Sequence, residues 1–492
     1  GEDQKWWLAP QETAVQCKVP WIIQDPFPGY HGVAWYWKRF EAPENPHLGG
    51  RTLLHFEAVD YKADVWVNDV SMGSHEGGEA PFDLDITEAL NEDGQNTLAV
   101  RVLNPTDTPI DGIVLSETPH RNKVNAYTAG SSYNHGGIVA PVRLLVVPAV
   151  YMTDLHVIPN AQTGEIRVET QIQNASDNEV SARLSLTAAP ASEGVTLTSG
   201  EKELELSLGN NHFESTLRIE NPHLWELNDP YLYRLTAHLQ LAGTGSFDER
   251  STRFGFRDFV FSKGYFRLNG HRLFLSCSHT GNHCPVGLQL PPDPDFLRRD
   301  LLNVKTMGFN AIRFIAGVAT PQQLDLCDEI GLMVYEESYA GWLLGDSPKM
   351  AERFDDSVGS MIRRDRNHPS VVMWGLLNET SDGPVFKHAV SSLPFVRGLD
   401  RTRMVMLNSG RFDGQTETIG GLSNPGSEVW ENVLSDLHPY RRVPHTAPII
   451  EEFRTMGSED RHAFISEYGI GSAVDLVQVT RHYEQLGKEN VE

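Results

Sequence analysis

The chain of 492 residues is short of cysteine and has no long apolar run. Its four cysteines are too sparse for a disulfide framework, and none of them forms a Cys-x-x-Cys pair. No uninterrupted apolar stretch approaches the roughly 18 to 20 residues that span a bilayer, and no basic and apolar leader begins at Gly1. A leader removed during export would leave the same sequence. We therefore expect a soluble protein, either cytoplasmic or exported.

Positive charge is the second deficit, with 41 basic residues against 66 acidic residues and a net charge of −25. Such a charge opposes electrostatic attraction to nucleic acid and to an anionic membrane face, so neither is an expected partner. Acidity also keeps a large protein soluble, and for that reason it names no substrate. We expect no cofactor, and a homo-oligomer remains open.

The length predicts about two to four domains, because one hydrophobic core seldom serves so many residues. Residues 1–148 carry short alternating apolar runs broken by turn clusters, which is typical of an antiparallel β-sandwich. Residues 149–258 continue the pattern, since Ile166, Val168 and Ile172 alternate with polar neighbours. Two consecutive all-β domains are expected.

From residue 259 onward the period changes to that of helices alternating with strands. Glycines at 308 and 331 mark helix ends, and each is followed by an apolar strand. The alternation predicts a parallel sheet, and the two sandwiches before it favour a barrel over an open sheet. Helices are expected at 296–308, 324–330 and 354–362, and strands at 311–314, 332–337, 371–377, 404–407, 433–437 and 463–466.

Two glutamates follow predicted strands. Glu379 comes one residue after the strand 371–377, and Glu467 directly follows the strand 463–466. The carboxyl ends of barrel strands carry catalytic groups, so both carboxylates are expected on one rim. Cleavage of a glycosidic bond needs such a pair, one protonated toward the leaving oxygen and one ionised. The alternative is that each glutamate is an ordinary strand-end carboxylate paired with an arginine.

The flanks of both acids resemble the family-2 glycoside hydrolases, which include β-galactosidases, β-glucuronidases and β-mannosidases. Segment 374–379, Trp-Gly-Leu-Leu-Asn-Glu, is similar to the W-x-x-x-N-E acid/base signature, and segment 465–469, Ile-Ser-Glu-Tyr-Gly, resembles the nucleophile segment. The resemblance implies a galactose-binding-like jelly-roll sandwich, an immunoglobulin-like sandwich and a (β/α)8 TIM barrel over residues 259–492, with Glu379 as acid/base and Glu467 as nucleophile. Further likeness lies in segments 30–36, 136–144, 224–233, 254–257 and 268–270.

The same resemblance assigns residues to the substrate site. Asn378 would bind the sugar 2-hydroxyl, and its alternative is a capping role. Arg313 matches the arginine of an N-A-x-R segment and would hold the nucleophile ionised, unless it forms a purely structural ion pair. His438 and Tyr440 fall at the end of the sixth strand, where the family often places partners of the substrate or the nucleophile. The other substrate-binding candidates are Glu337, Trp342, Tyr468, His279 and His283.

Two tryptophans are expected to have different roles. Trp374 lies within an apolar strand, which suits burial, whereas Trp342 follows the third strand in a loop and is the better candidate for stacking on a sugar.

The sequence departs from the family after Arg313, where segment 314–319 replaces the usual S-H-Y-P and its histidine. This departure argues against a standard β-galactosidase or β-glucuronidase pocket. Cys277, His279, His283 and Cys284 offer four metal ligands, but their spacing matches no common zinc motif, so no metal is expected. Under the alternative interpretation, His279 or His283 replaces the family's first-strand histidine near the substrate.

Residues 478–492 suit a seventh barrel helix and leave no eighth βα unit, so we expect an incomplete barrel. The sequence predicts a retaining, exo-acting β-glycosidase that releases a non-reducing-end β-galactoside, β-glucuronide or related sugar through a glycosyl-enzyme intermediate. The competing hypothesis is a catalytically silent carbohydrate-binding protein derived from a glycosidase. Carbohydrate is the expected partner under both.

Overall fold

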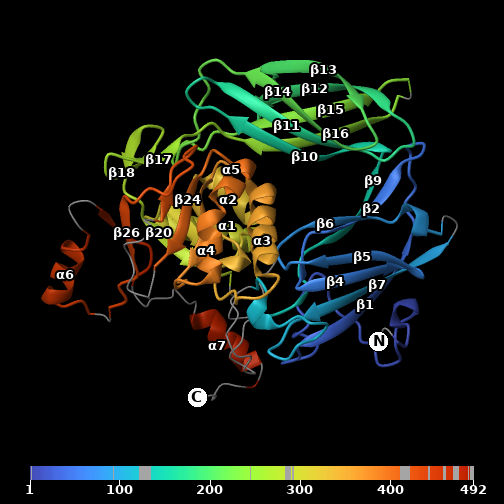
Figure 1. Ribbon diagram of the computed structural model, residues 1–492, viewed down its shortest axis with the longest axis horizontal. Coiled ribbons are helices and arrows are strands. Elements are labelled where there is room, and N and C mark those ends of the chain that lie inside the picture. The colour runs from blue at the N-terminus through green and yellow to red at the C-terminus, as the bar shows by residue number, and fades with distance from the viewer. Residues whose placement is uncertain are drawn as a thin grey trace.

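Two β-sandwiches adjoin a parallel sheet that is covered by helices (Figure 1). The computed structural model describes residues 1, 3–91, 94–120, 134–243, 245–282, 290, 293–410, 421–441, 444–457, 461–468, 476–485 and 487. This architecture confirms the predicted fold class of two all-β domains followed by an α/β domain. No helix in this described part of the chain combines the length and apolar character that a bilayer crossing requires.

The first sandwich packs a four-stranded antiparallel sheet against a three-stranded one. In β4, Ala63, Val65 and Val67 are buried while the alternate residues are partly exposed, which is the period of two expected for a half-buried strand. The larger sheet has the strand order β1 (Gly32–Glu41), β7 (Gln95–Asn104), β4 (Lys62–Val67), β5 (Val70–Glu76). The smaller sheet has the order β6 (Phe82–Asp85), β2 (Arg51–Phe56), β9 (Val142–Val147). Two short strands, β3 (Val59–Asp60) and β8 (Gly137–Ile138), pair with each other. Short 3-10 turns are η1 (Trp6–Leu8), η2 (Thr87–Ala89) and η3 (Leu115–Glu117).

The second sandwich also has two antiparallel sheets, which lie above the barrel in Figure 1. Ile166, Val168 and Ile172 are fully buried in its core, so the predicted alternation is confirmed. One sheet has the order β10 (Val150–Pro159), β11 (Glu165–Asn174), β14 (Gly209–Arg218), and the other β13 (Thr198–Leu206), β12 (Val180–Pro190), β15 (Tyr233–Leu241), β16 (Phe247–Phe254).

Five parallel strands in sequence order form the centre of the third domain, and β25 adds an antiparallel strand at one edge. The strands are β20 (Cys277–Thr280), β21 (Ala311–Phe314), β22 (Met333–Glu337), β23 (Val371–Asn378), β24 (Met404–Ser409) and β25 (Leu422–Ser423). Two further parallel strands pair with each other, β26 (Leu434–Leu437) and β27 (His462–Ile465). A three-stranded antiparallel sheet, β17 (Phe259–Ser262), β18 (Tyr265–Leu268) and β19 (His271–Leu273), precedes them.

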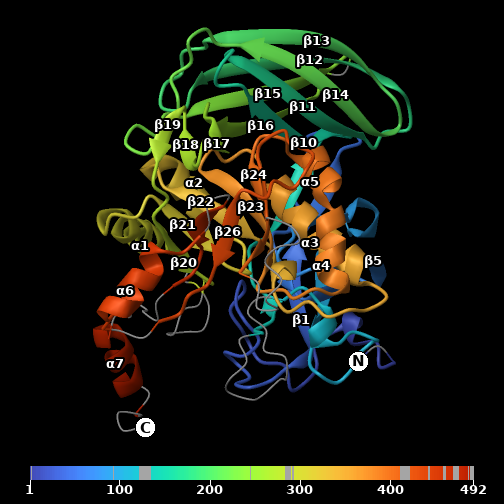
Figure 2. The ribbon, with the colours of Figure 1, turned by 60° about the vertical axis from the view of Figure 1, so that its left-hand side comes forward.

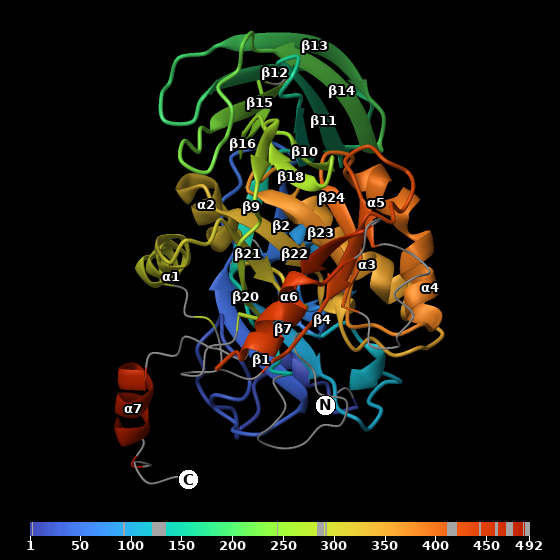
Figure 3. The same cartoon turned by 90° about the vertical axis from the view of Figure 1, so that its left-hand side faces the viewer.

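The helices of this domain are α1 (Pro294–Thr306), α2 (Pro321–Ile330), α3 (Met350–Asp365), α4 (Pro384–Ser391), α5 (Leu393–Leu399), α6 (Ala447–Arg454) and α7 (Leu476–Gln485), with a 3-10 turn η4 (Tyr339–Gly341). The predicted helices before β21, β22 and β23 are confirmed. We expected the last residues to form a seventh barrel helix, but α7 lies away from the six-stranded sheet (Figures 2 and 3). Periodicity alone reports an apolar face and not the surface that it covers.

Helix α2 shows how local sequence places the strand ends. The Thr320 hydroxyl accepts a hydrogen bond from the backbone N–H of Gln323, and the Thr320 backbone N–H donates to the side-chain oxygen of Gln323; Pro321 occupies the first turn. Gly331 ends the helix with φ +75°, and a Cβ there would lie 2.3 Å from the carbonyl oxygen of Leu227. Only glycine fits that position, so α2 ends there, and β22 follows from Met333.

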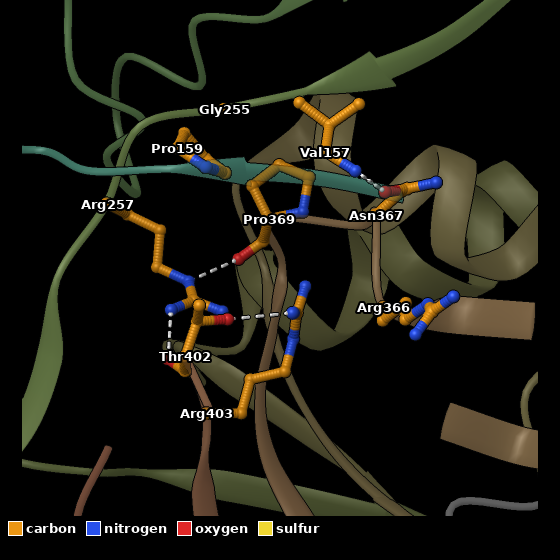
Figure 4. A pocket seen from close by; sticks show the side chains of 9 residues that line it. All are labelled: Val157, Pro159, Gly255, Arg257, Arg366, Asn367, Pro369, Thr402 and Arg403. Carbon is orange, nitrogen blue, oxygen red and sulfur yellow. Dashed lines mark hydrogen bonds between the residues drawn. The ribbon is translucent and has the colours of Figure 1, made fainter. Parts of the chain in front are cut away.

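Arg257 joins the second sandwich to the barrel at the amino ends of β23 and β24. Its guanidinium donates to the carbonyl oxygens of Pro369 at 3.1 Å and Thr402 at 3.0 Å (Figure 4). It also donates to the carbonyl oxygen of Val371 at 2.7 Å. Burial lowers the pKa of Arg257 to about 9. The cavity beside it holds about 20 Å³, room for roughly one water. This contact fixes the face of the barrel that lies opposite the strand carboxyl ends.

The first sandwich holds the loop that follows β22. Arg353 of α3 donates to the carboxylate of Glu76 at 2.6 Å, and the backbone N–H of Gly345 donates to the carbonyl oxygen of Ser116 at 2.6 Å. Glu79 is buried and accepts a hydrogen bond from the hydroxyl of Ser357. The loop between β22 and α3, on the rim of the barrel, is therefore braced by another domain.

A buried carboxylate behind β23 generates a stability prediction. Asp400 accepts hydrogen bonds from Trp374 Nε1 at 2.8 Å, Arg403 at 3.0 Å and Thr402. Burial alone would raise the pKa of Asp400, but Arg403 and the hydrogen bonds hold it well below its usual range. Ionised Asp400 therefore stabilises the fold fully at a pH above about 4, the ordinary pKa of an aspartate in the unfolded chain. This contribution declines as the pH falls below that value.

We predict that Asp400→Asn lowers the stability of the barrel by about 3 kcal/mol at pH 7, because Arg403 loses its buried partner. Urea unfolding followed by tryptophan fluorescence measures the shift of the midpoint. The difference from the unsubstituted protein should narrow below about pH 4. The exposed Asp69→Asn is the matched control; equal midpoints for both variants would contradict the role assigned to Asp400.

Candidate active site

The carboxyl ends of the barrel strands bring seven predicted residues together, one of which is Glu379, directly after β23. Arg313 lies on β21, Glu337 and Asn378 end β22 and β23, and His438, Tyr440 and Glu467 follow β26 and β27. Parallel pairing sets their depth: Arg313 is opposite Tyr335, and Leu437 is opposite Ile465. Side chains far apart in the sequence therefore share one rim.

Arg313 lies at the centre of this rim and is buried. It donates to Glu337 Oε1 through Nε at 2.9 Å and through Nη2 at 2.5 Å, and to Glu467 Oε1 through Nη1 at 2.9 Å. Nη2 also donates to Asn378 Oδ1 at 2.9 Å. Its guanidinium lies 4.8 Å from the ring centroid of Tyr335. One cation thereby fixes three acceptors from three strands.

Glu467 is held at both carboxylate oxygens. Oε1 accepts from Arg313 and lies 3.6 Å from His438 Nε2, while Oε2 accepts a hydrogen bond from the Tyr440 hydroxyl. Burial and then the Glu467 carboxylate raise the pKa of the Tyr440 hydroxyl, so that this group stays a donor. The Glu467 side chain is only 4% exposed. A permanent cation and a phenol thus each bind one oxygen of its carboxyl group.

Glu379 has a different environment from Glu467. Its Oε1 lies 2.8 Å from His438 Nδ1, and its side chain is 16% exposed. Among the described ion pairs its partner is this histidine and no arginine or lysine. The backbone of Glu379 has φ +49°, a left-handed conformation, and its N–H donates to the Ser409 carbonyl at 2.7 Å. Such conformations in non-glycine residues concentrate at functional sites.

The two glutamates are close to each other. One carboxylate oxygen of Glu379, one of Glu467 and a ring nitrogen of His438 all lie within 4.8 Å of one another. These atoms are also a geometric set for a divalent cation, but each is already engaged, with His438, Arg313 or Tyr440. A second set consists of Asp325, Asp328 and His368 near the second sandwich. There Asp325 accepts a hydrogen bond from Arg253, and Asp328 accepts one from the Ser370 N–H.

The segment after Arg313, which differs from the family's usual sequence, forms backbone hydrogen bonds to two buried glutamates. In place of the usual histidine, the segment turns so that the N–H of Ala316 donates to Glu337 Oε2 at 2.9 Å, and the N–H of Ala319 donates to Glu336 Oε1 at 2.8 Å. Glu337 is fully buried, with Arg313 at one oxygen and a backbone amide at the other. Its contacts are those of a support for Arg313, and substrate binding by Glu337 stays a prediction.

The remaining predicted residues lie around this centre. His279 is on β20 and exposed; partial loss of solvation lowers its pKa against the attraction of Glu467. Trp342 follows η4 and is half-buried, and Tyr468 is 62% exposed beside Glu467. Trp374 is fully buried, which confirms the prediction that it packs. His283 lies outside the described residues.

The proposed metal ligands are only partly described. Cys284, like His283, lies outside the described residues, while Cys277 lies within them. Burial raises the pKa of the Cys277 thiol to about 12, and its Sγ donates to the Ser278 carbonyl at 3.2 Å.

Sequence reasoning missed three polar residues of the site: Ser409, Asp436 and Ser466. Ser409 Oγ donates to Ser466 Oγ at 2.8 Å, and Ser466 Oγ donates to Asp436 Oδ1. Both serine hydroxyls lie near His438 Nε2, at 3.1 and 3.0 Å. The one available signal was that each residue lies in the last residues of a predicted barrel strand or just after it.

Comparison with known proteins assigns the family. The models of glycosyl hydrolases family 2 match its sugar binding domain at residues 2–148, its central domain at 150–257 and its TIM barrel domain at 262–489. The chain belongs to glycosyl hydrolase family 2. A family-2 assignment agrees with the resemblance seen in the segments around Glu379 and Glu467.

Individual relatives extend beyond this chain. A Formosa agariphila protein named "Putative beta-glucuronidase" is 30% identical over 448 residues, 87% of this chain and 39% of that protein. A Thermoanaerobacter pseudethanolicus beta-galactosidase is 29% identical over 381 residues, 76% of this chain and 48% of that protein. The chain thus spans less than half the length of these curated relatives. Bacteroides uniformis beta-glucuronidase shares the fold, with a TM-score of 0.73 at 22% identity over 93% of this chain and 56% of that one.

The arginine network predicts a charge-dependent loss of stability. Arg313→Met should destabilise the folded protein by about 3 to 5 kcal/mol at pH 7, because two buried carboxylates, Glu337 and Glu467, lose their counter-charge. Lowering the pH should recover part of the loss as the carboxylates gain protons. Arg313→Lys retains the charge and should lose less. Thermal unfolding between pH 5 and 8 checks this; equal losses for both variants at every pH would contradict it.

Proposed function

We propose that the protein hydrolyses β-linked glycosides with retention of anomeric configuration. The observation that carries the proposal is the short approach of the Glu379 and Glu467 carboxylate oxygens, within 4.8 Å, in unequal environments. Retaining glycosidases hold their two carboxyl groups about 5 to 5.5 Å apart, whereas inverting enzymes need about 6.5 to 9.5 Å for a water. Two acids in different surroundings are suited to two different roles.

In the first step Glu379 gives its proton to the glycosidic oxygen while a Glu467 oxygen attacks the anomeric carbon, and the leaving alcohol departs. In the second step ionised Glu379 takes a proton from water, whose oxygen attacks the same carbon and releases Glu467. Arg313 and Tyr440 hold Glu467 ionised and oriented between turnovers. Glu379, bound by the titratable His438, is the group free to lose and regain a proton.

Asn378 suits a role in sugar orientation. Its Oδ1 accepts from Arg313, so the side-chain amide nitrogen is the donor that faces a sugar hydroxyl, which we assign to the 2-position. A hydrogen bond to that hydroxyl can strengthen as the ring flattens toward the transition state.

The substrate class follows from the relatives and from the barrel rim. The curated relatives bear the names of a β-glucuronidase and a β-galactosidase, so we propose exo-acting release of a terminal β-linked sugar of this kind. The altered turn after Arg313 uses backbone amides where the family usually has a histidine. The sugar is therefore expected to make different contacts there from those in a standard β-glucuronidase or β-galactosidase.

The mechanism predicts a retained anomer. Aryl β-glucuronides, β-galactosides, β-glucosides and β-mannosides are incubated with the protein, and proton NMR follows the first-formed hemiacetal, which should be β. Glu467→Gln should lower kcat by at least about 10³-fold, since no ester can form. First formation of the α-anomer, or unchanged turnover by Glu467→Gln, would overturn the mechanism. Tight sugar binding without turnover across the panel would favour a silent carbohydrate-binding protein.

The acid/base role of Glu379 predicts a dependence on the leaving group. Glu379→Ala should lose about 10²- to 10⁴-fold in kcat/KM with a methylumbelliferyl glycoside, whose oxygen needs protonation. With a dinitrophenyl glycoside, which leaves as a stable anion, the first step should be nearly unaffected. Added azide should restore turnover and give a β-glycosyl azide. The surface variant Asp69→Asn is the control; equal losses with both leaving groups would exclude Glu379 as the acid.

A further inference from the structure

A chain of hydrogen bonds runs from Glu379 into the barrel. His438 Nδ1 lies 2.8 Å from Glu379 Oε1, and its Nε2 lies 3.0 Å from Ser466 Oγ, which donates to Asp436 Oδ1. The His438 side chain is only 1% exposed, and the second oxygen of Asp436 is buried without a hydrogen-bond partner in the described structure. The mechanism above uses neither Asp436 nor Ser466.

The hydroxyl hydrogen of Ser466 sets the direction of this chain. An ionised carboxylate only accepts hydrogen bonds, so Ser466 must give its one hydrogen to an ionised Asp436. Ser409 in turn donates to Ser466. The oxygen of Ser466 can then only accept from His438, which places the imidazole proton on Nε2 and a lone pair on Nδ1.

That lone pair faces Glu379 Oε1, and a hydrogen bond between them requires a proton on the carboxyl group. When Asp436 is protonated, the directions of these hydrogen bonds reverse. Ser466 becomes free to donate to His438 Nε2, and the imidazole proton moves to Nδ1. Nδ1 then donates to an ionised Glu379. The two ends of the chain therefore have opposite preferred protonation states.

We propose that Asp436, acting through Ser466 and His438, is a positioning residue that keeps Glu379 protonated at mildly alkaline pH. This inference rests on the proposed acid/base role of Glu379. Asp436 touches neither the sugar nor the reacting atoms; it sets the tautomer of His438 and places a negative charge behind it. Glu379 loses its proton to the leaving alcohol and regains one from the attacking water, so the proton count of the site is restored after each turnover.

The surroundings of Asp436 fit such a switch. Burial raises its pKa to about 7, opposed by the Ser466 hydrogen bond and by electrostatic interactions with His438 and Arg313, and reinforced by Glu467. Tyr335 of β22 also interacts electrostatically with it. These groups lie on β21, β22, β26 and after β27, and they are the charged and titratable neighbours that the described structure places around Asp436.

The test compares pH profiles of kcat/KM for methylumbelliferyl and dinitrophenyl glycosides. Asp436→Asn retains an acceptor but no charge, and Ser466→Ala removes the link. Each should move the alkaline limb for the methylumbelliferyl substrate down by about one pH unit, with KM unchanged. The limb for the dinitrophenyl substrate should stay in place. The double variant should show the shift of one single variant, since both break one path.

Asp69→Asn is the matched control, because it makes the same change of carboxylate to amide at an exposed position of the first sandwich. Its alkaline limb should stay at the position found for the unsubstituted protein. A limb unmoved in Asp436→Asn, an equal rate loss at every pH, or additive shifts in the double variant would overturn the proposal. Thermal midpoints verify that each variant is folded.

A readout that needs no turnover separates this proposal from the proposed function. Nitrogen-15 NMR of histidine-labelled protein reports the imidazole tautomer, and the His438 signal is assigned by its loss in His438→Gln. At pH 8 the signal should show the Nε2–H tautomer, and Asp436→Asn should shift it toward Nδ1–H. Absence of turnover in the unsubstituted protein would reject the glycosidase function, whereas one tautomer in both proteins would reject the relay.

Discussion

The Arg313 guanidinium is the contact on which the candidate site depends. It is buried, and it binds Glu337, Glu467 and Asn378, which come from three different strands. A buried ion pair has a large desolvation cost, and that cost is offset only where geometry is good and every polar atom is bound. Here the second oxygen of Glu337 meets the Ala316 amide and that of Glu467 meets the Tyr440 hydroxyl. The network therefore fixes the position and the direction of the Glu467 carboxyl group.

The same constraint separates the two glutamates chemically. Glu467 is enclosed by a permanent cation and a phenol, whereas Glu379 is more exposed and bound by a histidine. His438 is near both carboxylates and continues toward Asp436. The sandwiches contribute indirectly: Arg257 anchors the amino ends of the strands, and Arg353 braces the loop at the opposite rim. The two sandwiches thus support the barrel strands whose carboxyl ends bear the site residues.

Much of this could be predicted from the sequence. The strand at Ala311–Phe314 was predicted residue for residue, because a glycine stop precedes four buried residues. Glu379 and Glu467 were identified because they follow apolar strands and carry family-like flanks. The order of two sandwiches and an α/β domain followed from the change of period from two to that of helices.

Other features depend on contacts that sequence patterns do not record. Nothing local shows that Asp436 meets Ser466 thirty residues later, or that Glu337 faces Arg313. The antiparallel strand β25 and the position of α7 were also missed, because two residues or one amphipathic face do not specify a partner. Long-range pairings of this kind set the protonation states, and they appear only in three dimensions.

The central claim is that Glu467 forms the glycosyl-enzyme bond, and covalent trapping tests it most directly. The protein is inactivated with 2-deoxy-2-fluoro-β-glycosyl fluorides of the sugar that it hydrolyses, digested at acidic pH and mapped by tandem mass spectrometry. The account predicts one added fluorosugar on Glu467, within residues 462–481, where the other carboxyl side chain is Asp475. A label on Glu379 or elsewhere, or steady turnover without any label, would contradict it.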